Sequence, residues 1–302
     1  MRIRDAILLI GIAFIWGFNF VVIHWGLNHF PPLLFSALRF TLCGLPILFG
    51  LARPAVPWRS LLLLGLTLGF MVFGLLYLGI HAGMAAGMAS AVMQAQVLFT
   101  LALGVVLLGE KPSSASWLAI GIGFVGLALI FGRGGDHVPA LGFTLVLGGA
   151  LSWGVSNVLI KKLSPVPMLN LMVWISIVPP IPLFILSYLF EGGHLVEHAV
   201  AGLTAEGWIA VLYTSALSTL LAYGVWGAML QRYSAAAVSP FALLIPVFGL
   251  ASAWLFLGEQ LTLPDLMGPG LIITALLINW RAAGRDQRKG HASDMRERVA
   301  DA

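Results

Sequence analysis

Ten long runs of apolar residues constrain this chain more than any other feature of its sequence. A helix needs about 20 apolar residues to cross the roughly 30 Å hydrocarbon core of a bilayer. Because lipid offers no partner for exposed backbone N–H and C=O groups, such runs must be helices. The sequence predicts an all-α membrane protein with spans at Ala6–Leu27, Pro31–Ala52, Leu61–Ile80, Ala82–Leu108, Ala115–Phe131, Leu141–Ile160, Met168–Phe190, Trp208–Leu230, Ala235–Leu257 and Leu266–Trp280.

Composition supports this reading and excludes several classes of protein. Of 302 residues, 60% are hydrophobic and 9% are charged, whereas a soluble domain has about 25% charged residues. The basic residues do not gather with aromatic residues on a polar face, so nucleic-acid binding is not expected. Cys43 is the single cysteine, which excludes a disulfide within the chain and a metal site built on cysteines. We expect no cofactor and no metal.

Lys and Arg are unevenly divided among the segments that join the apolar runs. If the N-terminus is cytoplasmic, fourteen of the 16 basic residues fall in cytoplasmic segments, Arg133 falls outside and Arg39 lies within a span. Cytoplasmic loops of membrane proteins carry such an excess, and one span more or fewer would scramble it. The pattern predicts ten spans with both termini cytoplasmic. The charged tail, 282–302, is expected to be disordered and cytoplasmic.

The two halves of the chain repeat each other. Gly109-Glu110 ends the fourth predicted span and Gly258-Glu259 ends the ninth, 149 residues later. Ser90 matches Ser239 at the same spacing, and Trp-Gly pairs begin at positions 16 and 153. Residues 1–135 and 136–281 thus form two five-helix repeats. Since five is odd, the halves cross the membrane in opposite senses, a design that places a substrate site at the repeat interface.

Several short motifs also resemble a known family. They are Ile15–Val21, Leu38-Arg39-Phe40, Gln94-Ala95-Gln96, Ser152-Trp153-Gly154 with Asn157, and the two Gly-Glu pairs. With them, residues 5–280 resemble the drug/metabolite transporter superfamily in its EamA branch. Within that branch the chain looks most like bacterial amino-acid exporters, among them exporters of cysteine and O-acetylserine and YddG-type exporters of aromatic amino acids. The resemblance implies a multi-pass bacterial inner-membrane transporter that exports amino acids.

Polar and aromatic residues within the spans are candidates for a substrate cavity, because polar groups in lipid are costly unless they face a cavity or a partner. The alternative is that Ser, Thr and Gln join helices while Trp and Tyr mark the membrane interfaces. Packing is favoured for a single Ser or Thr, and the cavity for Gln94 and Asn157. The predicted cavity residues are Trp16, Asn19, Tyr77, Ser90, Gln94, Trp153, Ser156, Asn157, Ser215, Thr219, Tyr223 and Trp226.

Three charged residues lie within or at the ends of the predicted spans. Arg39 lies well inside the second span, where a lone Arg costs about 2.5–3.5 kcal/mol. It is a candidate partner for a substrate carboxylate, although a structural role is favoured. Glu110 and Glu259 lie at helix C-termini, where the helix dipole disfavours an acid. Each is expected to have a specific hydrogen-bond partner or to cap the helix that follows it.

The predicted function is export of amino acids and related metabolites by alternating access through a central cavity. The alternative is export of another small metabolite or a drug. No Asp or Glu lies near the middle of a span, so facilitated export is favoured over proton coupling. The H-x-x-E-H pattern at His194–His198 is expected to be a solvated loop, and no enzymatic constellation is predicted. The bilayer and a small-molecule substrate are the expected partners; a monomer suffices.

Overall fold

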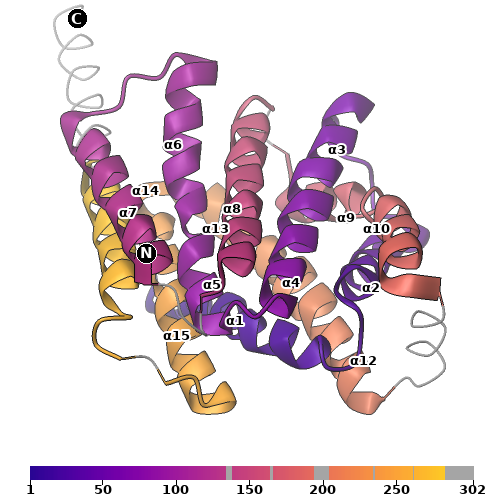
Figure 1. Ribbon diagram of the computed structural model, residues 1–302. Helices are drawn as coiled ribbons and strands as arrows, with labels where there is room; N and C mark the ends of the chain where they lie inside the picture. The colour runs from indigo at the N-terminus through magenta and orange to yellow at the C-terminus, as the bar shows by residue number, and fades with distance from the viewer. Residues whose placement is uncertain (134–137, 164–165, 194–203, 234, 261, 283–302) are drawn as a thin grey trace, which may run out of the picture.

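The computed structural model describes residues 1–133, 138–163, 166–193, 204–233, 235–260 and 262–282 (Figure 1). Within these ranges the regular structure is helical, and nine helices are long and apolar enough to cross a membrane. They are Ile3–Gly26, Pro32–Phe49, Trp58–His81, Ala86–Leu108, Ser114–Gly132, Ala140–Lys161, Met168–Gly192, Ala205–Arg232 and Ser239–Leu257. These nine confirm the all-helical membrane architecture and agree with nine of the predicted spans to within a few residues.

A shorter helix over residues 267–282, yellow in Figure 1, overlaps the tenth predicted span. Its length leaves it outside the nine, so the ten-span arrangement stays a prediction. The tail beyond it and the His194–His198 pattern lie outside the described residues.

Most spans are interrupted rather than continuous. In the first half they comprise α1 (Ile3–Gly26), α2 (Pro32–Gly44) with η1 (Leu45–Phe49), α3 (Trp58–Leu64) with η2 (Gly65–Met71) and α4 (Val72–His81), α5 (Ala86–Met93) with α6 (Ala95–Leu108), and α7 (Ser114–Arg133). In the second half they comprise α8 (Ala140–Lys161), α9 (Met168–Ile175) with α10 (Pro180–Leu186) and η3 (Ser187–Gly192), α12 (Ala205–Leu212) with η4 (Tyr213–Leu221) and α13 (Ala222–Arg232), and α14 (Ala235–Val238) with η5 (Ser239–Leu243) and α15 (Leu244–Leu257).

The interruptions have local causes. Pro46 lies in η1 and Pro240 in η5, both of which are 3-10 segments, because proline lacks the N–H that would continue an α-helix. The wider π-helical turns of η4 contain Thr219, whose hydroxyl donates to the Thr214 carbonyl five residues earlier at 2.9 Å. Such turns occur at functional sites and let a helix bend.

Glycines allow the two halves to pack closely through matched contacts. A Cβ on Gly17 of α1 would lie 2.6 Å from the Phe248 Cβ of α15, and one on Gly154 of α8 would lie 2.7 Å from the Phe99 Cβ of α6. Phe99 and Phe248 are 149 residues apart. The Trp-Gly pairs therefore serve the same purpose in each half, since only glycine admits so close a helix crossing. Figure 1 shows α4, α8 and α6 side by side.

Candidate substrate cavity

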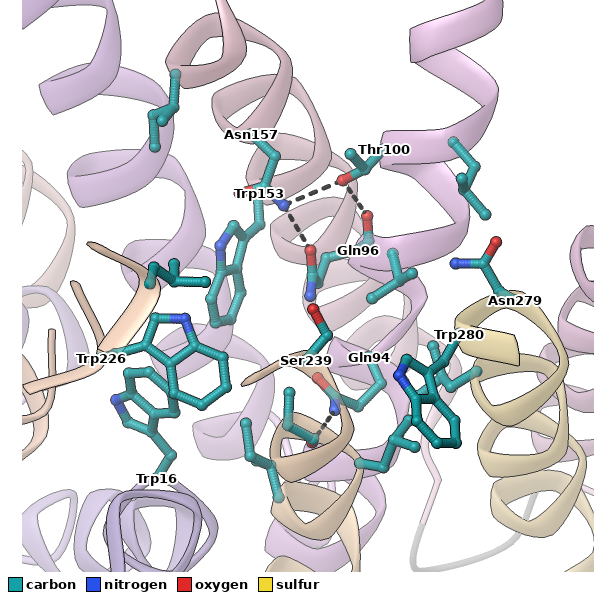
Figure 2. A pocket seen from close by; sticks show the side chains of 18 of the residues that line it. Trp16, Gln94, Gln96, Thr100, Trp153, Asn157, Trp226, Ser239, Asn279 and Trp280 are labelled. Atoms are coloured by element: carbon teal, nitrogen blue, oxygen red, sulfur yellow. Dashed lines mark hydrogen bonds between the residues drawn. The ribbon is translucent and has the colours of Figure 1, made fainter. Parts of the chain in front are cut away.

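A cavity of about 540 Å³ lies between the two halves (Figure 2). Its size is within the range of small-molecule sites. Both halves contribute to its lining, and it reaches from Trp16 in α1 to Ile160 and Leu230 near the ends of α8 and α13. Its polar and aromatic lining residues are Trp16, Gln94, Gln96, Thr100, Trp153, Asn157, Tyr223, Trp226, Ser239, Asn279 and Trp280.

Two interrupted helices meet at this cavity. The fourth span breaks at Gln94, between α5 and α6, and the ninth is 3-10 helical up to Leu243, which is 149 residues later. Both positions line the cavity, and the Gln94 side-chain nitrogen donates to the Ala242 carbonyl at 3.1 Å. The amide of one broken helix thus satisfies a carbonyl of the other. Transporters commonly build substrate sites from discontinuous helices of this kind.

The polar wall of the cavity is a connected network on α6 and α8. The Asn157 side-chain nitrogen donates to the Gln96 side-chain oxygen at 2.6 Å and to the Thr100 hydroxyl oxygen at 3.0 Å. The Thr100 hydroxyl donates in turn to the Gln96 backbone carbonyl at 2.6 Å. Figure 2 shows these three side chains together at one side of the cavity. The network holds both amides in single orientations.

An aromatic wall faces this network. The Trp16 ring packs against Tyr223 and Trp226, each with ring centroids 5.2 Å apart. The Trp16 indole N–H donates to the Ser218 carbonyl at 2.9 Å, so it is occupied and the residue offers the cavity an apolar surface. Trp153 extends this aromatic lining, and Trp280 lines the cavity on the other side of Gln94, as Figure 2 shows. Such faces suit an apolar side chain, or an ammonium group held by cation–π attraction.

Six of the predicted cavity residues line this cavity: Trp16, Gln94, Trp153, Asn157, Tyr223 and Trp226. The structure places Asn19, Tyr77, Ser90, Ser156, Ser215 and Thr219 elsewhere. Ser90, Ser156 and Ser215 donate to carbonyls of their own spans, at 2.6, 2.8 and 2.7 Å. Asn19 is buried, and its side-chain oxygen has no hydrogen-bond partner within the described part of the chain.

Arg39 is also placed away from the cavity, with two of the predicted residues as its partners. Its guanidinium donates to the Thr219 hydroxyl oxygen at 2.8 and 3.2 Å and to the Tyr77 hydroxyl at 3.1 Å. It lies over the Phe73 ring, 3.8 Å from the centroid. The side chain is 1% exposed. The described partners of Arg39 are thus residues of the protein itself, and its role stays a prediction.

Sequence reasoning did not select Gln96, Thr100, Ser239, Asn279 or Trp280, which line the cavity. A continuous fourth helix would place Gln96 and Thr100 on a different face from Gln94, but the break at Gln94 brings all three to the cavity. Ser239 is the repeat partner of Ser90, but Ser90 does not line this cavity, so the repeat alone did not identify Ser239. Asn279 and Trp280 lie at the end of the last predicted span, and no signal distinguished them from interfacial residues.

The cavity offers hydrogen bonds and aromatic surfaces rather than charge. Its described lining residues include no Asp, Glu, Lys, Arg or His. The described residues also contain no group of three or more His, Cys, Asp or Glu that could hold a metal ion. The cavity can therefore bind a small neutral or zwitterionic molecule by polar contacts on one side and apolar contacts on the other.

Comparison with known proteins identifies the class. Residues 4–132 and 140–281 each match the EamA-like transporter family. The chain is 40% identical to a protein of Salmonella typhimurium named a probable amino-acid metabolite efflux pump, over 92% of this chain and 95% of that protein. It is 38% identical to an Escherichia coli protein of the same name, over 94% and 98%. The chain belongs to the EamA-like transporter family, which confirms the resemblance seen in its motifs, and it is a multi-pass membrane transporter.

A solved structure, described only as the crystal structure of a protein, supports the fold. It shares a TM-score of 0.62 and 18% identity with this chain, and the match covers 92% of this chain and 96% of that one. At that identity the likeness concerns the fold alone.

Proposed function

We propose that this protein exports neutral amino acids and related metabolites across the bacterial inner membrane. The observation that carries the proposal is a cavity of substrate size at the repeat interface, with amides on one wall, aromatic rings on the other and no charged side chain among its described lining residues. A zwitterion fits such a site because its two charges need donors and acceptors, not a counter-ion. The relatives named as amino-acid metabolite efflux pumps support this substrate class.

The proposed topology has ten spans, with the helix 267–282 as the last and both termini cytoplasmic. Two observations support an inverted repeat. Helix interruptions occur at related positions of the two halves, at Gln94 and at Leu243. Close glycine contacts also recur at related positions, at Gly17 and at Gly154. Halves of five spans each can match in this way only if they run in opposite senses.

The proposed mechanism is alternating access, and this structure corresponds to the state that faces the cytoplasm. The cavity reaches helix ends beside Lys161 and Arg232, on the face with the excess of basic residues. At the opposite face, the Glu259 carboxylate accepts hydrogen bonds from the Ala86 and Gly87 N–H groups at 2.6 and 3.1 Å. This contact joins α15 to α5 and supports closure on the outside.

Uptake into proteoliposomes that hold only this protein tests the proposal. The substrates are labelled cysteine, O-acetylserine, phenylalanine and leucine, each offered with and without a pH gradient. We expect saturable uptake without the gradient, because the described lining has no group that titrates near neutral pH. Gln94→Ala should lower it about tenfold, the cost of one buried hydrogen bond. If folded protein moves none of these under any gradient, another metabolite or a drug is the substrate.

A further inference from the structure

The orientation of the amides in the polar wall can be deduced from their partners. Oxygen and nitrogen of a side-chain amide are distinguished only by what they contact. The Thr100 hydroxyl oxygen lies 2.6 Å from the Gln96 backbone carbonyl, which can only accept. The single hydroxyl proton of Thr100 is therefore used there. Towards Asn157, at 3.0 Å, the Thr100 oxygen can only accept, so Asn157 must present its NH₂ group.

The same reasoning determines the orientation of the Gln96 side-chain amide. The Asn157 NH₂ group also lies 2.6 Å from the end of the Gln96 side chain. Because a donor needs an acceptor, Gln96 presents its oxygen to Asn157, and its own NH₂ group is turned away. Figure 2 shows the Gln96 nitrogen on the side away from Asn157, towards Ser239 and Gln94. Gln96 lines the cavity, so its NH₂ group is available there as a donor.

Gln94 has the opposite polarity. Its nitrogen donates to the Ala242 carbonyl at 3.1 Å, and a carbonyl cannot donate. The side-chain oxygen of Gln94 is therefore left as an acceptor, and the residue lines the same cavity. Gln94 lies at the helix break and Gln96 two residues later in α6. The two glutamines thus offer the cavity one donor group and one acceptor.

We propose that Gln96 and Gln94 form a polarised pair that binds the head group of an α-amino acid. The Gln96 NH₂ group donates to the carboxylate, and the Gln94 oxygen accepts from the ammonium group. Asn157 and Thr100 are positioning residues that keep the Gln96 nitrogen aimed at the cavity and do not touch the substrate. This inference rests on the proposed function, and it revises the direct contact expected for Asn157.

The pair selects for molecules that carry both charges. A simple amine or a simple carboxylic acid would satisfy one glutamine and leave the other without a partner, which a buried polar group tolerates poorly. Discrimination against a molecule that lacks the expected partner is strong at such sites. The aromatic wall of Trp16, Tyr223 and Trp226 is left for the side chain, where the selection among amino acids would then occur.

Asn157→Asp tests whether Asn157 positions Gln96, because it should reverse the orientation of the Gln96 amide. Aspartate offers only acceptors, so Gln96 should rotate to give its NH₂ group to Asp and turn its oxygen to the cavity. Binding is measured on the purified full chain with labelled cysteine, O-acetylserine, phenylalanine and leucine, each competed by its own carboxamide. Affinity for the amino acid should fall at least tenfold, and affinity for the carboxamide, which can donate, should rise relative to the amino acid. Asn170→Asp, outside the cavity, is the matched control and should change neither.

Gln96→Glu supplies a second measurement, and decides the matter if Asn157→Asp does not fold. It keeps an acceptor for Asn157 but removes the N–H groups aimed at the cavity, so amino-acid binding should fall at least tenfold with an unchanged thermal unfolding midpoint. A contrary result is that wild-type protein binds amino acids while a folded Asn157→Asp or Gln96→Glu variant keeps the wild-type ratio of affinities for amino acid and carboxamide. In that case the proposed glutamine pair is wrong and the proposed function stands. If wild-type protein binds none of the probes, the proposed function itself fails.

Discussion

At the residue scale, Arg39 shows how a charge is accommodated inside a span. Its three hydrogen bonds go to the hydroxyl oxygens of Thr219 and Tyr77, and its flat face lies on Phe73. The planar guanidinium can satisfy two hydroxyls and stack on a ring at once, which a lysine ammonium cannot. Arg39 thereby ties α2 to the third and eighth spans.

Arg39→Lys should destabilise the protein without altering substrate affinity. The lysine keeps the charge but loses the forked contact with Thr219 and the stacking on Phe73, at a cost of about 1.5–3 kcal/mol. Thermal unfolding in detergent measures this, and Arg53→Lys, at an exposed position, is the control that should have little effect. A tenfold rise in KM with unchanged unfolding would instead make Arg39 a partner of the substrate carboxylate.

At the element scale, the two Gly-Glu helix ends have the same backbone and different partners. Gly109 and Gly258 adopt φ angles of 66° and 67°, a left-handed conformation that glycine readily adopts and that ends a helix. In both, the N–H of the following Glu donates to the backbone carbonyl six residues earlier, at 3.2 and 3.3 Å. Glu259 then caps α5, whereas Glu110 pairs with Lys161 at 2.5 Å. Both acids thus have specific partners, which was the first of the two expectations, and the helix that Glu259 caps is α5 rather than the one that follows it.

Glu259→Ala should therefore cost more stability than Glu110→Ala. Removing an N-cap acceptor costs about 0.5–2 kcal/mol, whereas the Glu110–Lys161 pair is 37% and 57% exposed, and exposed pairs contribute about 0–1 kcal/mol. The two acids are repeat partners, so each variant controls for the other. Unfolding midpoints measured side by side in detergent decide the order. Equal losses would mean that the cap on α5 adds nothing beyond a surface pair.

At the scale of the whole molecule, the described state is asymmetric although the sequence repeats. The cavity reaches the helix ends near Lys161 and Arg232, and Glu259 joins α15 to α5 at the opposite face. Two halves of related sequence thus hold different conformations at their two ends. The proposed inverted repeat would account for this asymmetry, if each half adopts in the alternate state the conformation that the other half has here.

Reactivity of a cysteine introduced at Leu230 tests the direction in which the cavity faces. Leu230 is 38% exposed and lines the cavity, while Cys43 is buried and should not react. A membrane-impermeant maleimide should label Leu230→Cys in inside-out vesicles and spare it in right-side-out cells. Arg53→Cys and Asn28→Cys report the predicted inner and outer faces. Labelling of Leu230→Cys from the outside alone would reverse the proposed orientation.

The sequence predicted most of the fold because lipid imposes a simple condition. A backbone in hydrocarbon must satisfy its own hydrogen bonds, so a run of about 20 apolar residues specifies a helix whatever its neighbours are. The nine membrane helices follow from this condition. Six of the cavity-lining side chains follow from the rule that a polar group within a span must face a partner or a cavity. Both arguments use the residues of one span at a time and need no knowledge of its neighbours.

Only the tertiary structure decided how those helices break and which polar groups meet. The interruption at Gln94 rotates Gln96 and Thr100 to the cavity, and it is stabilised by the Ala242 carbonyl, 148 residues away in the chain. Arg39 is likewise satisfied by Thr219, 180 residues away. The sequence by itself determined that this is a helical membrane protein with a repeated plan. Which amides face the substrate depended on long-range partners, since a side-chain amide takes its orientation from the groups it contacts.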